Sequence, residues 1–193
     1  MTLSSEKILA IYRETGALLE GHFLLTSGLH SDKYFQSAKV FQYPWHAETL
    51  CRAIAGHFEN EDIDAVVSPA VGGIVAGQET ARLLGKRSIF TERVDGKMTL
   101  RRGFEIRAGE RILVVEDVTT TGGSVREVID VVRRGDAVPV SVAAVVDRSG
   151  GTIDFGIPYF ALMQIEVQNY QPEKCPLCRE GSTPVKPGSR GLK

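Results

Sequence analysis

The segment that most constrains the fold of this chain is residues 112–124, with the sequence ILVVEDVTTTGGS. Its leading apolar residues predict a short strand buried on both faces, as in a parallel sheet. After this segment, Val125, Val128, Ile129 and Val132 recur at helical spacing. The segment therefore predicts a strand, a tight loop and a helix in succession, which is the repeating unit of α/β proteins.

The loop within this segment suits a phosphate and a sugar together. Gly122 and Gly123 allow a sharp turn, and free N–H groups at a helix start, with nearby hydroxyl groups, suit a phosphate monoester. Carboxylates repel phosphate but accept hydrogen bonds from ribose hydroxyls. The residues of the expected site are Glu116, Asp117, Val118, Thr119, Thr120, Thr121, Gly122, Gly123 and Ser124. The alternative is an ordinary junction whose acids are favoured by the helix dipole.

Two other phosphate-binding motifs are absent from the sequence. The residues after Gly72–Gly77 are Gln78 and Glu79, where a Walker loop requires Lys and Ser or Thr. No Gly-x-Gly-x-x-Gly fingerprint for a dinucleotide occurs. The phosphate site is therefore expected in the acidic, Thr- and Gly-rich loop.

The remaining pattern alternates strands and helices and predicts a mostly parallel sheet. The expected helices are 6–20, with Ser5 as N-cap, one beginning at Pro44, 73–84 and 124–135; the expected strands are 63–67, 88–90, 111–115 and 140–146; residues 21–39 are expected to be irregular. Ligands bind beyond the carboxyl ends of parallel strands. The expected binding loops are therefore 68–73, 91–110, 116–124 and 147–151.

Composition excludes several classes of function. The chain has 23 basic and 24 acidic residues and a net charge of −1, which argues against a general nucleic-acid or membrane binder. No apolar run approaches the roughly 18 residues of a membrane span, and the first residues do not resemble a secretory signal. Three cysteines make a poor disulfide framework. We expect a cytoplasmic protein.

The proline-containing tail, residues 171–193, is expected to be a surface extension. It contains Cys175 and Cys178 at the spacing of half a zinc site, but a structural zinc requires four ligands. The four histidines are scattered: His46 and His57 are expected on the surface, and a position near the substrate is an alternative for His30. We therefore expect no metal site here, with a four-cysteine site shared by two chains or a redox pair as the alternatives. Cys51 is expected in the core.

The segment 112–124 closely resembles the phosphoribosyl-diphosphate loop of the type I phosphoribosyltransferases. The segment SPAVGG at 68–73 is similar to that family's diphosphate loop, and GHFLLTSGLHSDKYF at 21–35 resembles the N-terminal hood of its orotate-specific branch. The resemblance covers about residues 5–165. It implies a hood in residues 1–40, an α/β core in 41–170 and a C-terminal extension in 171–193. It also implies the transfer of phosphoribose from phosphoribosyl diphosphate to orotate.

The same resemblance implies the catalytic groups. Arg93 and Lys97, on a mobile loop that closes over the site of a neighbouring subunit, are expected to act with Asp117 in a homodimer. Mg²⁺, held mainly by substrate oxygens, is the implied cofactor. The sequence departs from the family pattern at Thr26, Val94 and Thr99, where relatives carry basic residues. Arg101 and Arg102 are candidates to compensate; a solvated charged hairpin is the alternative.

Orotate is expected to contact Tyr34, Phe35, Thr120 and Arg148, because a planar guanidinium matches its carboxylate. The alternatives are that Tyr34 and Phe35 are ordinary core aromatics and that Arg148 forms a surface ion pair with Asp147 or Asp154. Two other functions stay open: transfer to a different base, and a regulator that has kept the fold without the activity.

Overall fold

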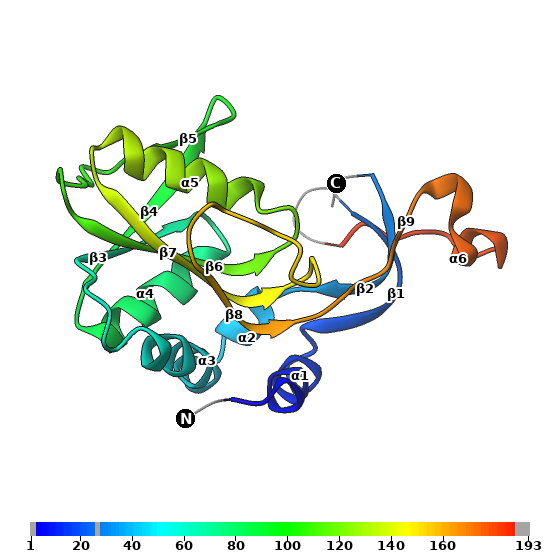
Figure 1. Ribbon diagram of the computed structural model, residues 1–193. Helices are drawn as coiled ribbons and strands as arrows, with labels where there is room; N and C mark the ends of the chain where they lie inside the picture. Colours follow the sequence, from blue (N-terminus) through cyan, green and yellow to red (C-terminus); the bar gives the residue numbers. More distant parts are fainter. Residues whose placement is uncertain (1–2, 26–27, 188–193) are drawn as a thin grey trace.

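The computed structural model describes residues 3–25 and 28–187, and Figure 1 shows a helix-covered sheet beside a smaller β-hood. The larger sheet has the strand order β5-β4-β3-β6-β7-β8. Its strands are β3 (Ala65–Pro69), β4 (Arg87–Val94), β5 (Lys97–Leu100), β6 (Arg111–Thr119), β7 (Val138–Asp147) and β8 (Tyr159–Gln164). All neighbours pair in parallel except β4 and β5. The predicted α/β class is therefore confirmed.

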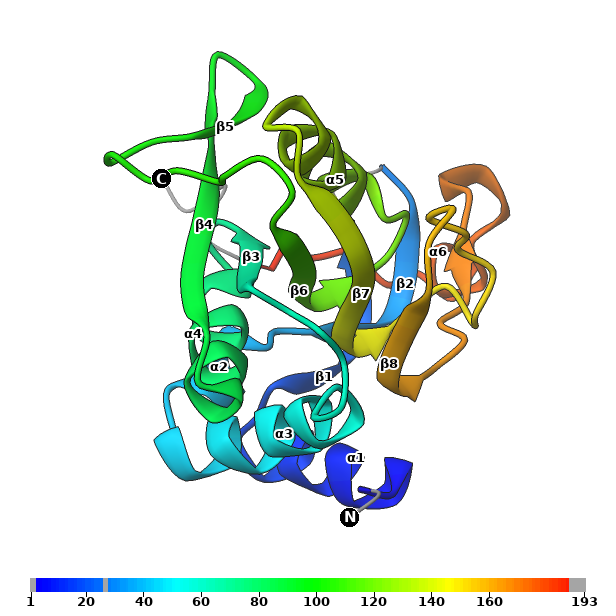
Figure 2. The same cartoon turned by 60° about the vertical axis from the view of Figure 1, so that its left-hand side comes forward.

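Helices cover both faces of this sheet, as Figure 2 shows from a second direction. Helix α5 (Gly123–Arg134) packs on one face. Helices α1 (Ser5–Glu14), α3 (Pro44–His57) and α4 (Gly73–Leu84) pack on the other. Strands β3 and β6 are buried on both faces because both helical layers cover them, which explains their unbroken Val and Ile runs.

Several predicted elements are confirmed. Helix α3 begins with Pro44, whose missing N–H costs nothing at that position. Its apolar face is buried as the spacing predicted, and Cys51 is a core residue. Gly135 caps α5, as expected. In the structure β6 runs to Thr119, so the acids belong to the strand end rather than to the loop.

The expected helix over residues 6–20 is wrong in its second half. Helix α1 ends at Glu14 because Gly16 adopts a left-handed conformation with φ +63°, and Leu19 lies in the next strand. The N-cap is Ser4, not Ser5; its hydroxyl accepts a hydrogen bond from the Lys7 N–H. The apolar residues of a short strand happened to continue the helical spacing.

Residues 21–39 are also more regular than expected. Strands β1 (Leu18–Leu24) and β2 (His30–Phe35) form an antiparallel pair, followed by the short helix α2 (Ala38–Phe41). The third strand, β9 (Asn169–Tyr170), lies beside β2 and comes just before the tail. We call this three-stranded sheet the hood; it lies beyond β6 and β8 (Figure 1).

The tail passes over the outside of the hood. It includes helix α6 (Pro176–Arg179), and Val185 exchanges backbone hydrogen bonds with β1, donating to His22 O and accepting from Leu24 N. Most of its described residues are at the surface, as predicted, but Cys175 is fully buried.

Candidate active site

The phosphate cradle, residues 118–124, lies at the carboxyl end of β6, where the sequence placed it. A small hollow of about 70 Å³ is lined by Glu116 and by Val118 to Val125. Gly122 adopts φ +76°, and a Cβ there would meet the Phe155 ring at 2.7 Å, so only glycine fits. The turn directs the start of α5 into the hollow, which is the arrangement that binds anions.

The two acids lie against the loop between β3 and α4. A Cβ at Gly72 would meet Asp117 Oδ1 at 2.8 Å, and a Cβ at Gly73 would meet Glu116 Oε1 at 2.8 Å. The Gly-Gly pair therefore lets this loop approach both carboxylates. The sequence showed both motifs but not their contact, because the two lie on neighbouring strands that are distant along the chain.

Glu116 is buried, whereas Asp117 is partly exposed. Burial raises the pKa of Glu116 well above its usual value, and the neighbouring charge of Asp117 raises it further. A buried carboxylate with so few partners is costly in the protein alone. Such a group is stabilised when a ligand supplies hydrogen-bond donors.

Thr119 is among the residues that line the hollow, but its hydroxyl group is engaged elsewhere. Its hydroxyl lies 2.6 Å from the Tyr159 hydroxyl and donates to Asp147 Oδ1 at 3.4 Å. Thr119 is the last residue of β6, and its side chain faces the neighbouring strand β7 and beyond it β8. Thr120 and Thr121 are exposed, and Ser124 is half-buried, so these residues carry the hydroxyl groups free for a ligand.

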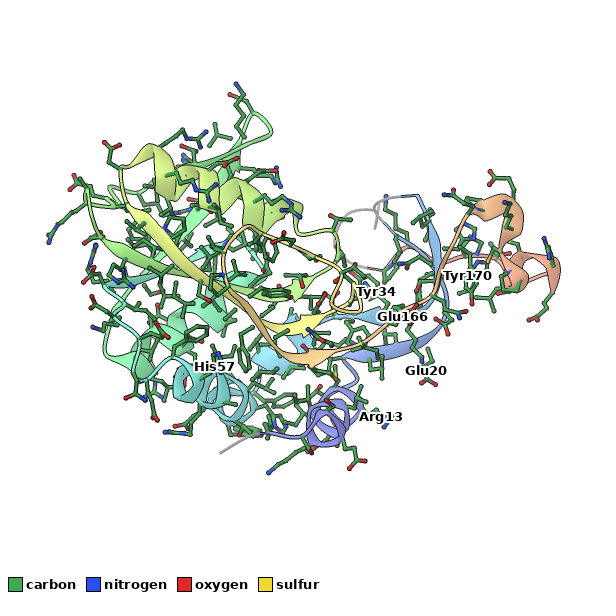
Figure 3. All side chains as sticks on the ribbon, in the orientation of Figure 1. Arg13, Glu20, Tyr34, His57, Glu166 and Tyr170 are labelled. Carbon is green, nitrogen blue, oxygen red and sulfur yellow. The ribbon has the colours of Figure 1, made fainter. Side chains whose placement is uncertain are left out.

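A larger cavity of about 580 Å³ lies between the hood and the core sheet. Residues from β2, α2, the 71–75 segment and β6 line it, among them Tyr34, Phe35, Gly72, Asp117 and Val118. Figure 3 shows Tyr34 at this junction. Phe35 is also a core residue, packed edge-on against Tyr12, so the expected base contact and the core alternative both apply to it.

Arg148 contacts both the end of β6 and the hood strand β2, although it lines neither the cradle nor the larger cavity. Its backbone N–H donates to Thr119 O at 2.9 Å, and its guanidinium lies over the Phe35 ring, with Cζ 5.7 Å from the centroid. Among the described residues it has no carboxylate partner, and its buried Nε lacks a hydrogen bond. The surface ion pair considered from sequence is therefore wrong.

Asp147 does not form the ion pair with Arg148 that was considered from the sequence. It is fully buried and accepts hydrogen bonds from the N–H groups of Ser149 and Gly151. It therefore shapes the 147–151 loop and leaves the charge of Arg148 unmatched. Burial lowers the pKa of Arg148 from its ordinary value.

The expected catalytic cations lie away from the cradle of their own chain. Residues 87–100 form the β4–β5 hairpin, whose tip projects outward in Figure 1. Arg93 pairs with Glu127 of α5 at 2.7 Å, and Lys97 is exposed. Neither residue lines the cradle or the larger cavity. Arg102 pairs with Glu92 at 2.8 Å, and Thr26 lies outside the described residues.

The histidines are less scattered than the sequence suggested. His22 Nε2 and His30 Nδ1 are 2.9 Å apart, and both lie beside Cys175 and Cys178. The expectation of no four-ligand cluster in one chain is therefore wrong, because the hood brings both ends of the chain together. His30 does not line the larger cavity. His57 is exposed and stacks on Phe160, as expected of a surface residue, whereas His46 is only partly exposed.

Similarity to known proteins agrees with this geometry. Residues 45–172 match the family model described as "Phosphoribosyl transferase domain". The chain is 53% identical to the orotate phosphoribosyltransferase of Chlorobium phaeobacteroides (strain DSM 266), over 97% of each chain. It is 54% identical to that of Caldicellulosiruptor bescii, over 97% of this chain and 99% of the relative. The chain belongs to the orotate phosphoribosyltransferase family.

A solved orotate phosphoribosyltransferase from Aeropyrum pernix has the same fold, with a TM-score of 0.67 and 22% identity. The likeness covers 82% of this chain and 93% of that one. The type I phosphoribosyltransferase fold and the family expected from the sequence are both confirmed. No helix among the described residues has the length and apolar character needed to traverse a bilayer.

Proposed function

We propose that this enzyme transfers the 5-phosphoribosyl group of phosphoribosyl diphosphate to orotate, forming orotidine 5′-monophosphate and releasing diphosphate. The observation that carries the proposal is the buried Arg148, whose Nε lacks a hydrogen-bond partner and whose guanidinium lies over Phe35, a residue that lines the cavity. A carboxylate on a planar ring is the ligand that such a group recognises best.

The cradle is proposed to bind the 5-phosphate. The N–H groups of 121–124 and the hydroxyls of Thr120, Thr121 and Ser124 surround a hollow of suitable size. Asp117 and Glu116 then accept hydrogen bonds from the ribose hydroxyls, which satisfies the buried Glu116. The Gly72–Gly73 loop is placed to let diphosphate approach backbone N–H groups.

The reaction replaces diphosphate at the anomeric carbon by the orotate nitrogen. Its transition state has oxocarbenium character, so the protein must stabilise charge on the leaving group and exclude water. Orotate is already acidic at the reacting nitrogen, and no general base is assigned. Phe35 and Tyr34 shield the base side of the cavity.

Lys97 and Arg93 are proposed to neutralise the diphosphate of a neighbouring subunit in a homodimer. The projecting hairpin supports this, since neither side chain lines the cradle or the larger cavity of its own chain. When the β4–β5 hairpin closes over the neighbouring site, Arg93 must leave its ion pair with Glu127 and bind the substrate instead. An exposed pair of this kind is weak.

Mg²⁺ is the proposed cofactor. Only two carboxylates, Glu116 and Asp117, border the cradle and the cavity among the described residues, and they do not form a closed cation site. That set fits an ion held mainly by substrate phosphates, which is how Mg²⁺ is usually bound. When bound, it would offset leaving-group charge.

In the decisive experiment, purified protein is incubated with phosphoribosyl diphosphate, Mg²⁺ and one free base at a time. Orotate should be consumed with release of diphosphate. Uracil differs from orotate by lacking the carboxylate, so it leaves Arg148 unpaired and should react about 10⁴-fold more slowly. Equal use of uracil, or preference for a purine, would overturn the assignment. No turnover with any base would favour a regulator.

A further inference from the structure

Four metal-ligating side chains converge on the outside of the hood, away from the active site. They are His22 on β1, His30 on β2, and Cys175 and Cys178 in the tail. One potential ligand atom from each lies within 4.8 Å of all the others. Three of the four residues are buried, so the cluster is shielded from solvent rather than spread on the surface.

The distances match a tetrahedron around one ion. His22 Nε2 lies 2.9 Å from His30 Nδ1 and 3.4 Å from Cys175 Sγ, and Cys178 Sγ lies 3.3 Å from His30 Nδ1. Zinc bonds of about 2.3 Å to sulfur and 2.0–2.1 Å to nitrogen imply tetrahedral edges of about 3.3–3.8 Å. Binding therefore requires the two imidazole nitrogens to move slightly apart and the most widely spaced ligand atoms, up to 4.8 Å apart, to move closer together.

A second layer of contacts fixes the orientation of His22. Its Nδ1 lies 3.1 Å from Ser182 O, and because a carbonyl oxygen only accepts, Nδ1 is the protonated nitrogen. Nε2 then presents its lone pair to the cluster. A backbone carbonyl that orients a ligating histidine is a regular feature of protein zinc sites.

The tail has little else to hold it in place. Among residues 171–187 only Cys175 is buried, and helix α6 has just four residues. Its backbone hydrogen bonds to β1 come from Val185, and strand β9, just before the tail, pairs with β2 through two residues. A segment with so small an apolar core ordinarily requires a disulfide or a metal for stability, and Cys175 and Cys178 are free thiols.

We propose that His22, His30, Cys175 and Cys178 bind one structural Zn²⁺, which joins the C-terminal tail to the hood. Two nitrogen and two sulfur ligands in a tetrahedral arrangement select zinc among common divalent ions. Four protein ligands leave no open coordination position, so the ion is structural and takes no part in the transfer reaction.

The first test measures metal content in untagged protein purified without chelators. Elemental analysis should find about one zinc per chain in the wild type. The Cys175→Ser, Cys178→Ser and His22→Gln variants should each lose most of it. Matched controls are Cys51→Ala, a buried cysteine elsewhere, and His57→Asn, a surface histidine; both should keep the metal.

The second test uses only the wild-type protein, so it does not depend on whether the variants fold. Chelator-stripped, reduced wild-type protein titrated with Co²⁺ should develop the visible bands of a tetrahedral ion and a thiolate charge-transfer band. Zinc should also slow proteolysis within 171–187 without changing cleavage elsewhere. The proposal would be overturned if the purified wild type contained no zinc and did not bind Co²⁺, or if Cys175 and Cys178 formed a disulfide instead of binding a metal. Transfer activity is not needed for either readout.

Discussion

The guanidinium of Arg148 lies over the ring of Phe35, with 5.7 Å between Cζ and the ring centroid, and has no carboxylate partner among the described residues. An unpaired buried cation costs stability, and hence its retention needs a reason. The proposed reason is the carboxylate of orotate. The contact with Phe35 also restrains the Arg148 side chain before the ligand arrives, which lowers the entropic cost of binding.

Replacing Arg148 should therefore separate affinity from stability. Arg148→Lys keeps the charge but loses the planar fork, and kcat/KM for orotate should fall by roughly ten- to 150-fold, equivalent to about 1.5–3 kcal/mol. The KM for phosphoribosyl diphosphate should change little. Arg148→Met should lose more activity but melt at a higher temperature than the wild type. Steady-state kinetics and thermal denaturation check both effects.

The control for this pair is Arg82→Lys on α4, an exposed arginine held by Glu79 and Glu48. In this variant, kcat/KM for orotate and the KM for phosphoribosyl diphosphate should stay within about twofold of the wild-type values. If Arg148→Lys behaved like this control, the carboxylate-binding role would be excluded.

Glu116→Gln should stabilise the ligand-free protein while impairing it as an enzyme. Because burial raises the pKa of Glu116, the folded protein holds a proton that the unfolded chain has lost above about pH 4.3. The free energy of unfolding therefore falls as the pH rises from about 4.3 to the raised pKa of Glu116 in the folded protein. The glutamine variant avoids this cost, so its melting temperature at neutral pH should exceed that of the wild type by about 2–4 °C per kcal/mol.

That advantage should vanish below about pH 4, where the carboxyl is protonated in both states. Glu48→Gln is the matched control, since its ion pair with Arg52 lowers the pKa of Glu48, so the sign of the effect is opposite. Melting curves across pH, together with ribose 5-phosphate binding, distinguish the two. A lower melting temperature for Glu116→Gln at neutral pH would contradict the prediction.

Gly122→Ala should damage the cradle directly. Gly122 has φ +76°, and the added Cβ would meet the Phe155 ring at 2.7 Å, so α5 must shift at its start. The expected loss of stability is about 1–3 kcal/mol, with a rise in the Kd for ribose 5-phosphate. Gly56→Ala in α3, where nothing lies within 4 Å of the added Cβ, should instead gain about 0.5–1 kcal/mol. Denaturant unfolding and calorimetry measure both.

Mixing Lys97→Ala with Asp117→Ala protein tests whether sites are shared. Each variant alone should have little activity. If the hairpin acts on the partner, random hybrids restore one intact site per mixed dimer, or about a quarter of wild-type activity after full subunit exchange. Native mass spectrometry verifies that hybrids form; hybrids without activity would show that the hairpin serves its own chain.

Much of the sheet could be predicted from the sequence because its signals are local. The Val- and Ile-rich runs before Glu116 and Asp147 mark buried parallel strands, and helix α5 between them carries regular apolar spacing. The cradle follows from the same logic, since a strand, a Gly-rich turn and a helix start are consecutive in the chain.

What the sequence did not reveal depends on contacts between distant segments. The approach of Gly72 and Gly73 to the acids, and the bond from Thr119 to Tyr159, require knowledge of strand order. The pairing of His22 with His30 depends on the register of β1 and β2, and the meeting of both with Cys175 depends on where the tail ends. A Cys-x-x-Cys pair and histidines in a hairpin were the available signal.

The hood combines segments that are distant along the chain, since β2 pairs with β9 and β1 hydrogen-bonds to Val185. During synthesis the α/β core can form while the tail is still inside the ribosome, because its contacts are nearer in sequence. The pocket for the base borders strands that stay incompletely paired until residues 169–185 emerge. A nascent chain whose tail is still inside the ribosome is therefore expected to bind ribose 5-phosphate before it can discriminate among bases.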